Sequence, residues 1–290
     1  MIATSTGANT SSTNVTSFVS VNSVFTRSIA PLPNQTGIVV LSTSGFTVLP
    51  WTYAVSVAPP QINAVVSAAD SKSPAAPGGL ITLYGTNLSP TNIATSQIPV
   101  PTALADSCIT VNGQPIPLIF VSPTQINAQM PFQAVGDETV VVHTPGGTSG
   151  NFNLVVQPNA PAVFLSGVAG PANNLPTVIR LANGQLATDS NPIHPGDTLI
   201  IYVTGLGQTN PAGLTGYPAP GLPLASALTS VGVSLGGLNL PVGYAGLAPG
   251  EVGVYQINVT VPNNVPVGIS VPLTIVQGSG SITVALRVIS

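Results

Sequence analysis

The stretch VSPTQINAQMP, residues 121–131, alternates apolar and polar side chains over its second half. In an extended chain these side chains fall on opposite faces: Ile126, Ala128 and Met130 against Gln125, Asn127 and Gln129. Pro131 then ends the strand, because proline donates no hydrogen bond to a β-ladder. The stretch therefore predicts a half-buried β-strand whose amide-rich face suits solvent or another polar surface.

The same phrase returns as VYQINVTVP, residues 254–262, where Ile257, Val259 and Val261 again alternate with polar side chains. Upstream, APGGLITLYGTNLSPTN (76–92) matches HPGDTLIIYVTGLGQTN (194–210) at a constant offset of 118 residues, while the Gln-Ile-Asn phrases match at an offset of 131. The second copy is thus longer by 13 residues between these landmarks. Repetition on this scale predicts two copies of one domain rather than a solenoid of short repeats.

Short alternating runs dominate the chain, among them LITLYGTNL, ETVVVHT and DTLIIYVTGL, and 30 glycines and 30 prolines separate them. Such spacing is typical of β-sandwiches. We predict an all-β protein with two tandem immunoglobulin-like β-sandwiches plus an N-terminal β-segment. The expected bounds are 1–59 for the N-terminal β-segment or arm, 60–157 for the first sandwich and 158–290 for the second, with the linker at QPNAP (157–161).

The first copy resembles an IPT/TIG immunoglobulin-like domain. The resemblance covers roughly residues 60–157 and rests on four motifs in order: the glycine-led strand LITLYGTNL, the hairpin ITVNGQPI, the strand VSPTQINAQMP and the closing VVVHTPGGTS. The second copy is more divergent and has VQGSGSITVALRV in place of the last motif. The tandem also looks like the paired C-terminal domains of large acidobacterial secreted proteins. These resemblances imply a fold and an extracellular setting, and no established activity.

The composition excludes several classes of protein. Charged residues make up only 4% of the chain, against about 25% in an ordinary soluble domain. Four basic residues cannot neutralise a nucleic-acid backbone, so no nucleic-acid partner is expected: Arg27, Lys72, Arg180 and Arg287. The sequence contains no run of about 20 apolar residues, the length that a membrane-spanning helix needs. A surface of Ser, Thr, Asn and Gln is typical of extracellular or cell-surface β-proteins, and we expect a bacterial exported protein whose signal peptide is not in this numbering.

The phrase GVSLG, residues 232–236, formally matches the G-x-S-x-G pattern of hydrolases. That chemistry requires a strand–turn–helix elbow and a histidine later in the chain. No histidine follows Ser234, and its neighbours alternate like a strand that ends in a Gly-Gly turn. We therefore predict no enzyme and no catalytic residue.

The sequence also gives little indication of a metal site or of a reactive thiol. His143 and His194 belong to different copies, which argues against a shared zinc site. Asp137 and Glu138 suit a turn followed by a strand, although a weak calcium site is an alternative. Cys108 is the single cysteine, so no internal disulfide can form, and its strand-like setting favours a buried or half-buried thiol. We predict no metal site and no cofactor.

The function that fits these observations is structural: a spacer, an adhesion module or a subunit of a self-assembling fibre. The alternative is a carbohydrate-binding ancillary region of a secreted enzyme. Trp51 and Tyr53 alternate on one strand and could form a sugar-stacking platform, or they could belong to an N-terminal core.

Self-association is the partner interaction we expect, because the lysines that blunt edge strands are nearly absent. Residues 13–26, TNVTSFVSVNSVFT, alternate like a strand outside both repeats. Added to a neighbour's sheet, this segment would act as a strand donor through its apolar residues Val15, Phe18, Val21 and Val24. Alternatively, it folds into its own N-terminal domain.

Overall fold

The computed structural model describes residues 2–3, 9–11, 29–31, 37–42, 45–50, 58–167 and 174–290. All regular elements among these residues are β-strands, so the all-β prediction is confirmed. The described residues contain no helix that is long and apolar enough to cross a lipid bilayer. The chain divides into two compact units, Met1–Val57 and Ala58–Ser290.

The first unit contains short antiparallel strands. Strand β1 (Ile2–Ala3) pairs with β2 (Asn9–Ser11), and a three-stranded sheet has the order β3 (Ile29–Pro31), β4 (Gly37–Ser42), β5 (Gly45–Pro50). The predicted strand-donor residues and the predicted sugar platform lie outside the described residues: Val15, Phe18, Val21, Val24, Trp51 and Tyr53.

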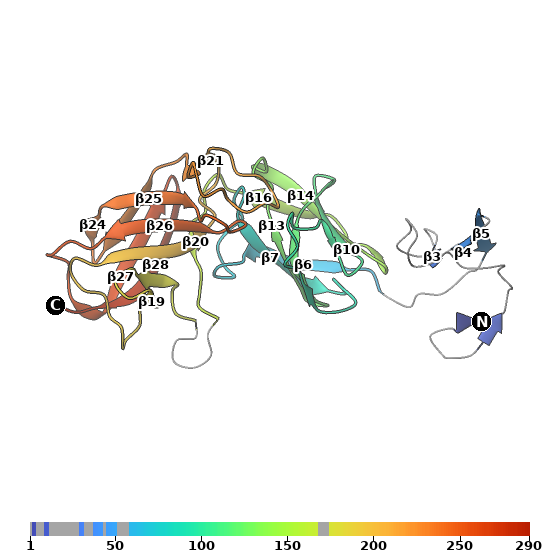
Figure 1. Cartoon of the computed structure of the whole chain (residues 1–290), viewed down its shortest axis with the longest axis horizontal. Helices are drawn as coiled ribbons and strands as arrows, with labels where there is room; N and C mark the ends of the chain where they lie inside the picture. The colour runs from blue at the N-terminus through green and yellow to red at the C-terminus, as the bar shows by residue number, and fades with distance from the viewer. Residues whose placement is uncertain are drawn as a thin grey trace. The chain divides into compact units, whose positions relative to one another are not determined.

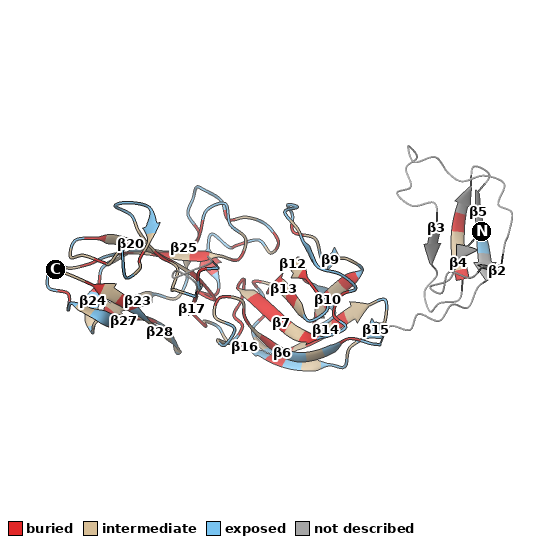
Figure 2. Cartoon of the chain, turned by 90° about the horizontal axis from the view of Figure 1, so that it is seen from below, coloured by how far each residue is buried: buried red, intermediate tan, exposed pale blue. Residues whose placement is uncertain are grey.

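The second unit begins with two packed sheets, which we call the first sheet pair. One sheet has the order β6 (Gln61–Ser67), β7 (Leu80–Thr86), β13 (Gln125–Gln129), β12 (Leu118–Val121), β8 (Ile93–Ala94). The other has the order β11 (Gln114–Pro115), β10 (Ser107–Val111), β14 (Gly136–Thr144), β15 (Gly147–Thr148), with β9 (Ala103–Leu104) on β10 and β16 (Phe152–Val156) on β14. Apolar side chains from both sheets form one core, and β7 is largely buried (Figure 2).

Two further sheets form the second sheet pair. The larger has the order β19 (Gln185–Leu186), β18 (Val178–Arg180), β20 (Thr198–Thr204), β26 (Tyr255–Thr260), β25 (Val242–Leu247), β22 (Ser226–Ala227), β21 (Thr209–Asn210), with β17 (Ala162–Val163) on β20. The four-stranded sheet has the order β24 (Leu238–Leu240), β23 (Val231–Leu235), β27 (Gly268–Gln277), β28 (Gly280–Val288). Figure 1 shows β25, β26 and β20 running side by side, and a second core lies between the two sheets.

The repeated phrases occupy the same register in both sheet pairs. Gln125 on β13 lies opposite Tyr84 on β7, and Gln256 on β26 lies opposite Tyr202 on β20. The apolar residues of both phrases are buried, as the alternation predicts: Ile126, Ala128, Met130, Ile257, Val259 and Val261. Gln129 departs from the pattern, because this polar side chain is fully buried. The reason lies at the junction of the two sheet pairs.

Candidate functional site: the junction between the sheet pairs

Gln129, the last residue of β13, joins the two sheet pairs through its side-chain amide. Its Nε2 donates to the carbonyl oxygen of Gly78 at 3.1 Å, within the first sheet pair. Its Oε1 accepts a hydrogen bond from the Gly216 backbone N–H, in the second, at 2.7 Å. A buried amide is tolerated only when its hydrogen bonds are made, and both ends of this one are satisfied. The predicted polar face of the strand thus meets protein at this position rather than solvent.

Phe132 anchors the first sheet pair in the core of the second. Its side chain is 5% exposed and belongs to the apolar cluster of the second sheet pair. Two glycines make room for the ring. A Cβ added to Gly78 would lie 2.1 Å from the ring, and one added to Gly213 would lie 2.3 Å from it. Both distances are far below van der Waals contact, so the junction requires glycine on both sides of the ring.

Two further side chains of the second sheet pair reach back into the first. The Thr204 Oγ1 accepts from the backbone N–H of Leu80 at 2.9 Å and donates to the carbonyl of Gly253 at 2.8 Å. The Tyr255 hydroxyl lies 2.6 Å from the carbonyl oxygen of Gly207 and 3.2 Å from that of Pro77. Tyr255 is fully buried, and this burial raises the pKa of its phenol well above the ordinary value. The hydroxyl therefore stays protonated and able to donate.

The linker between the sheet pairs is hydrogen-bonded at both ends. Gln157 N–H donates to the Ala75 carbonyl at 2.9 Å, and Ala160 N–H donates to the Gly205 carbonyl at 2.9 Å. Gly205 adopts φ +81°, and a Cβ there would lie 2.1 Å from the Ala160 carbonyl oxygen. These contacts tie one end of the linker to the first sheet pair and the other end to the second, which differs from an exposed, free-standing connection.

The second sheet pair does not repeat these anchors at its own equivalent positions. Thr260 stands where the first copy has Gln129, and Asn263 stands where it has Phe132; both are exposed. Asp197 replaces Gly79 and forms an ion pair with Arg180, with Nε to Oδ2 at 2.8 Å. The junction is therefore built for one particular order of the two copies.

In the second sheet pair, the Arg180–Asp197 ion pair lies at the end of the strands that corresponds to the junction end of the first sheet pair. A second guanidinium nitrogen of Arg180 donates to the other Asp197 oxygen at 3.1 Å, and the His194 backbone N–H donates to Oδ2 at 2.7 Å. Burial by itself would raise the pKa of Asp197, but the hydrogen bonds from Arg180 and His194 and the nearby positive charge outweigh it. The net result holds the pKa of Asp197 below its ordinary value.

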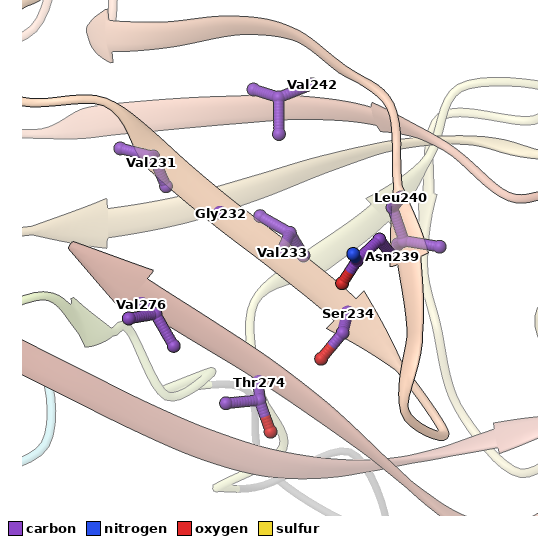
Figure 3. Close-up of a pocket in the computed structure, with 9 residues that line it drawn as sticks. All are labelled: Val231, Gly232, Val233, Ser234, Asn239, Leu240, Val242, Thr274 and Val276. Carbon is purple, nitrogen blue, oxygen red and sulfur yellow. The ribbon is translucent and has the colours of Figure 1, made fainter.

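Ser234 of the GVSLG phrase lies in the middle of β23 rather than on a strand–turn–helix elbow. It faces outward between Asn239 on β24 and Thr274 on β27, beside an open hollow of about 460 Å³ (Figure 3). The strand ends in a turn at Gly236 and Gly237, both with positive φ. No histidine or carboxylate is among the nine residues that line the hollow, so this site has no general base for a serine nucleophile.

Of the two carboxylates considered as calcium ligands, Glu138 is hydrogen-bonded by protein groups. Glu138 accepts from the Asn112 side chain and from the Val135 backbone N–H, while Asp137 is exposed. Among the described residues, no three metal-ligating side chains form a cluster.

Strand pairing places Cys108 opposite His143, a juxtaposition that their separation in sequence concealed. Burial raises the pKa of the Cys108 thiol, and the His143 ring lies within hydrogen-bond distance of Thr110 Oγ1, at 3.3 Å. These contacts give the pair no activated nucleophile.

The model of the IPT/TIG domain family matches residues 60–169. No curated protein matches the chain. Similar solved structures include a surface glycan-binding protein of Prevotella bryantii (13% identity, TM-score 0.25, covering 78% of this chain and 41% of that one) and SGBP-B of the Bacteroides ovatus mixed-linkage glucan utilization locus in complex with a heptasaccharide (16%, 0.33, 87% and 52%). Domains 4 and 5 of the S-layer protein SbsC are also similar (16%, 0.22, 68% and 82%).

The chain spans about half or less of the length of the two glycan-binding proteins, and likenesses of this size carry no function across. The family match covers the first sheet pair and the motifs that resemble the family in sequence, and extends past them through the linker and β17. It supports an immunoglobulin-like domain in this part of the chain.

Proposed function

We propose that residues 60–290 form a rigid two-domain spacer in a non-enzymatic extracellular or cell-surface bacterial protein. The observation that carries the proposal is the junction, where Gln129, Phe132 and Tyr255 are buried between the sheet pairs. Domain contacts within one chain are usually polar and permit relative motion. Here an aromatic anchor and one buried amide, whose hydrogen bonds are made, replace such a surface, and a spacer needs this stiffness to hold its ends at a fixed distance.

In this proposal the second sheet pair is a divergent duplicate of the first, with domains at 60–157 and 158–290. The shared register of Tyr84 with Gln125 and of Tyr202 with Gln256 supports the duplication. The anchors were then acquired or retained by one copy alone, since Thr260 and Asn263 are exposed. Because the second domain lacks these anchors, it cannot attach a further domain in the way that the first domain attaches the second. A pair that ends in this way suits a spacer of defined length.

Calorimetric unfolding tests the coupling of the two domains. The parent protein should show a single transition for residues 60–290, because unfolding one domain exposes the Phe132 pocket of the other. Phe132→Ala removes the anchor and should split the transition, with the free energy of unfolding lowered by about 3–5 kcal/mol. Ile269→Ala, which truncates a side chain that is 83% exposed, is the matched control and should leave one transition. Two separate transitions in the parent would contradict the rigid spacer.

Surface location is tested separately, by immunogold labelling of intact producing cells with an antibody against the second domain. We expect label on unpermeabilised cells. Label that requires permeabilisation would contradict a surface role, whatever the rigidity of the junction.

Carbohydrate binding is a second candidate, favoured by the hollow beside β23. Hydroxyl and amide groups from adjacent strands stand in one row there: Asn239, Ser234 and Thr274 (Figure 3). No aromatic ring lines the hollow, although a stacking ring is a common part of sugar sites. Titration with soluble bacterial and plant glycans tests this candidate. Binding that Ser234→Val weakens and Ser281→Val does not would place the ligand in the hollow, and no binding would leave the spacer role alone.

A further inference from the structure

Strand β28 forms an open edge of the four-stranded sheet. At nine residues it is the longest edge strand in the described part of the chain. Gln277 and Gly280 pair directly across the two-residue turn, so alternate residues of β28 face β27. The intervening residues, Ser281, Thr283 and Ala285, direct their backbone N–H and C=O groups away from the sheet. Arg287 continues this series, and its carbonyl accepts a hydrogen bond from the Ile193 N–H at 2.9 Å on the side away from β27. This bond agrees with the assignment of Ser281, Thr283 and Ala285 as the residues whose backbone groups point outward.

The outer edge of β28 is covered at its C-terminal end, where Ile193 pairs with Val288 beside the charged Arg287, and is open before that point. From Gly280 to Leu286 the strand carries no charge and no proline, and its register with β27 is continuous from the turn to Val271. Ser281, Thr283 and Ala285 are small and exposed. In the described structure no main-chain hydrogen bond reaches their outward N–H groups. Natural monomers generally blunt such edges with lysine, proline, a bulge or a covering segment.

The edge is also self-complementary. The three outward residues are symmetric about Thr283: a small uncharged side chain stands two positions away on each side. Ile282 and Val284, on the inner face, are only partly buried at the rim of the core. A second β28 laid antiparallel would cover them with the same two residues. With a net charge of −3 over 290 residues, two copies repel one another little.

We propose that two copies of this chain associate through β28, antiparallel about a two-fold axis at Thr283. Thr283 then lies opposite its counterpart, and Ser281 lies opposite the second copy's Ala285. The outward N–H and C=O groups form hydrogen bonds, and two four-stranded sheets become one of eight strands. The pairing does not depend on the spacer role, since it uses backbone groups of β28 and none of Gln129, Phe132 and Tyr255. The start of β28 does lie beside the linker, because a Cβ added to Gly280 would be 2.6 Å from the Pro161 ring.

Cysteine cross-linking in a Cys108→Ser background tests the register. Residues opposite one another in a hydrogen-bonded antiparallel pair have Cα atoms about 5.5 Å apart, within the range of a disulfide. Thr283→Cys should therefore form a covalent dimer under mild oxidation. Ser281→Cys is the matched control: its two copies would be about 14 Å apart, too far to bridge. A mixture of Ser281→Cys with Ala285→Cys chains should cross-link, while each alone should not.

A non-covalent measurement completes the test. Sedimentation equilibrium of the parent chain should show a monomer–dimer equilibrium that is nearly indifferent to salt, because no ion pair contributes. Thr283→Pro removes an outward N–H that β27 does not use, and should weaken dimerisation at least tenfold with the circular dichroism spectrum unchanged. Equal cross-linking of Thr283→Cys and Ser281→Cys, or a parent that stays monomeric at millimolar concentration, would overturn the proposal. So would dimerisation that is lost on deleting residues 1–27 while Thr283→Cys fails to cross-link, which would assign the contact to the N-terminal segment.

Discussion

The side-chain oxygen of Gln129 accepts the backbone N–H of Gly216 at 2.7 Å, so a residue of the first sheet pair satisfies a buried backbone group of the second. Neither sheet pair can make this bond by itself. If they separate, both groups must find water instead, and that requirement couples the stability of each sheet pair to the presence of its neighbour.

Replacing Gln129 with methionine keeps the length of the side chain and removes both hydrogen bonds. We expect the free energy of unfolding to fall by about 1–3 kcal/mol, because the Gly216 N–H is left buried without a partner. Gln125→Met is the control on the same strand: its amide bonds to Asn127 and does not reach the second sheet pair. Urea denaturation of both variants gives the comparison, and equal losses would show that Gln129 has no special role.

Gly213→Ala should disrupt the junction by crowding the Phe132 ring. Gly213 has no positive φ, so the effect isolates the steric conflict with the ring at 2.3 Å. Overpacking of this kind costs about 1–3 kcal/mol. Phe132→Leu shortens the opposing side chain and should recover part of the loss in the double variant. A double-variant cycle measured by thermal unfolding checks this, and strict additivity would contradict direct contact between the two positions.

Alkaline pH should weaken the junction through Tyr255. Its pKa is raised by burial in the folded protein, whereas the unfolded chain ionises near its ordinary value of about 10. The unfolded state then loses a proton that the folded state keeps, so the free energy of unfolding falls as pH rises above about 10. Tyr255→Phe should lower stability at pH 7 by about 1 kcal/mol and flatten this alkaline decline. Tyr217→Phe, at an exposed position, should leave the pH profile as it is.

Acid should lower the stability of the second sheet pair by protonating Asp197, the partner of Arg180. Its pKa is lowered in the folded protein, so its stabilisation is complete above the unfolded value of about 3.9 and is lost as pH falls through the folded value. At pH 7, Asp197→Asn should cost about 3 kcal/mol, because it leaves the largely buried Arg180 without its counter-ion. The gap between parent and variant should narrow below about pH 4. Asp189→Asn, which changes an exposed carboxylate, should show no such convergence.

The sequence predicts the strands of this protein well and its junction poorly. Residues 125–131 alternate so clearly that their buried and half-buried faces follow directly, and the repeat places β26 in the same role as β13. The burial of Gln129 does not follow from the sequence. Alternation places its side chain on the polar face of the strand, but it does not reveal that the second sheet pair covers that face at this position. Phe132 follows Pro131, which ends the strand, so no alternating pattern indicates whether its side chain is buried. The pairing of Cys108 with His143 depends on sheet register, which composition and spacing do not reveal.

If the junction holds the two sheet pairs in one fixed arrangement, the distance between a label on each of them has a single narrow distribution. Spin labels at Asn153→Cys on β16 and Asn239→Cys on β24, both at exposed positions, would report the separation by double electron–electron resonance in a Cys108→Ser background. We predict a single narrow distribution for the full chain, which Phe132→Ala broadens. A broad or multimodal distribution in the parent, unchanged by Phe132→Ala, would contradict the claim.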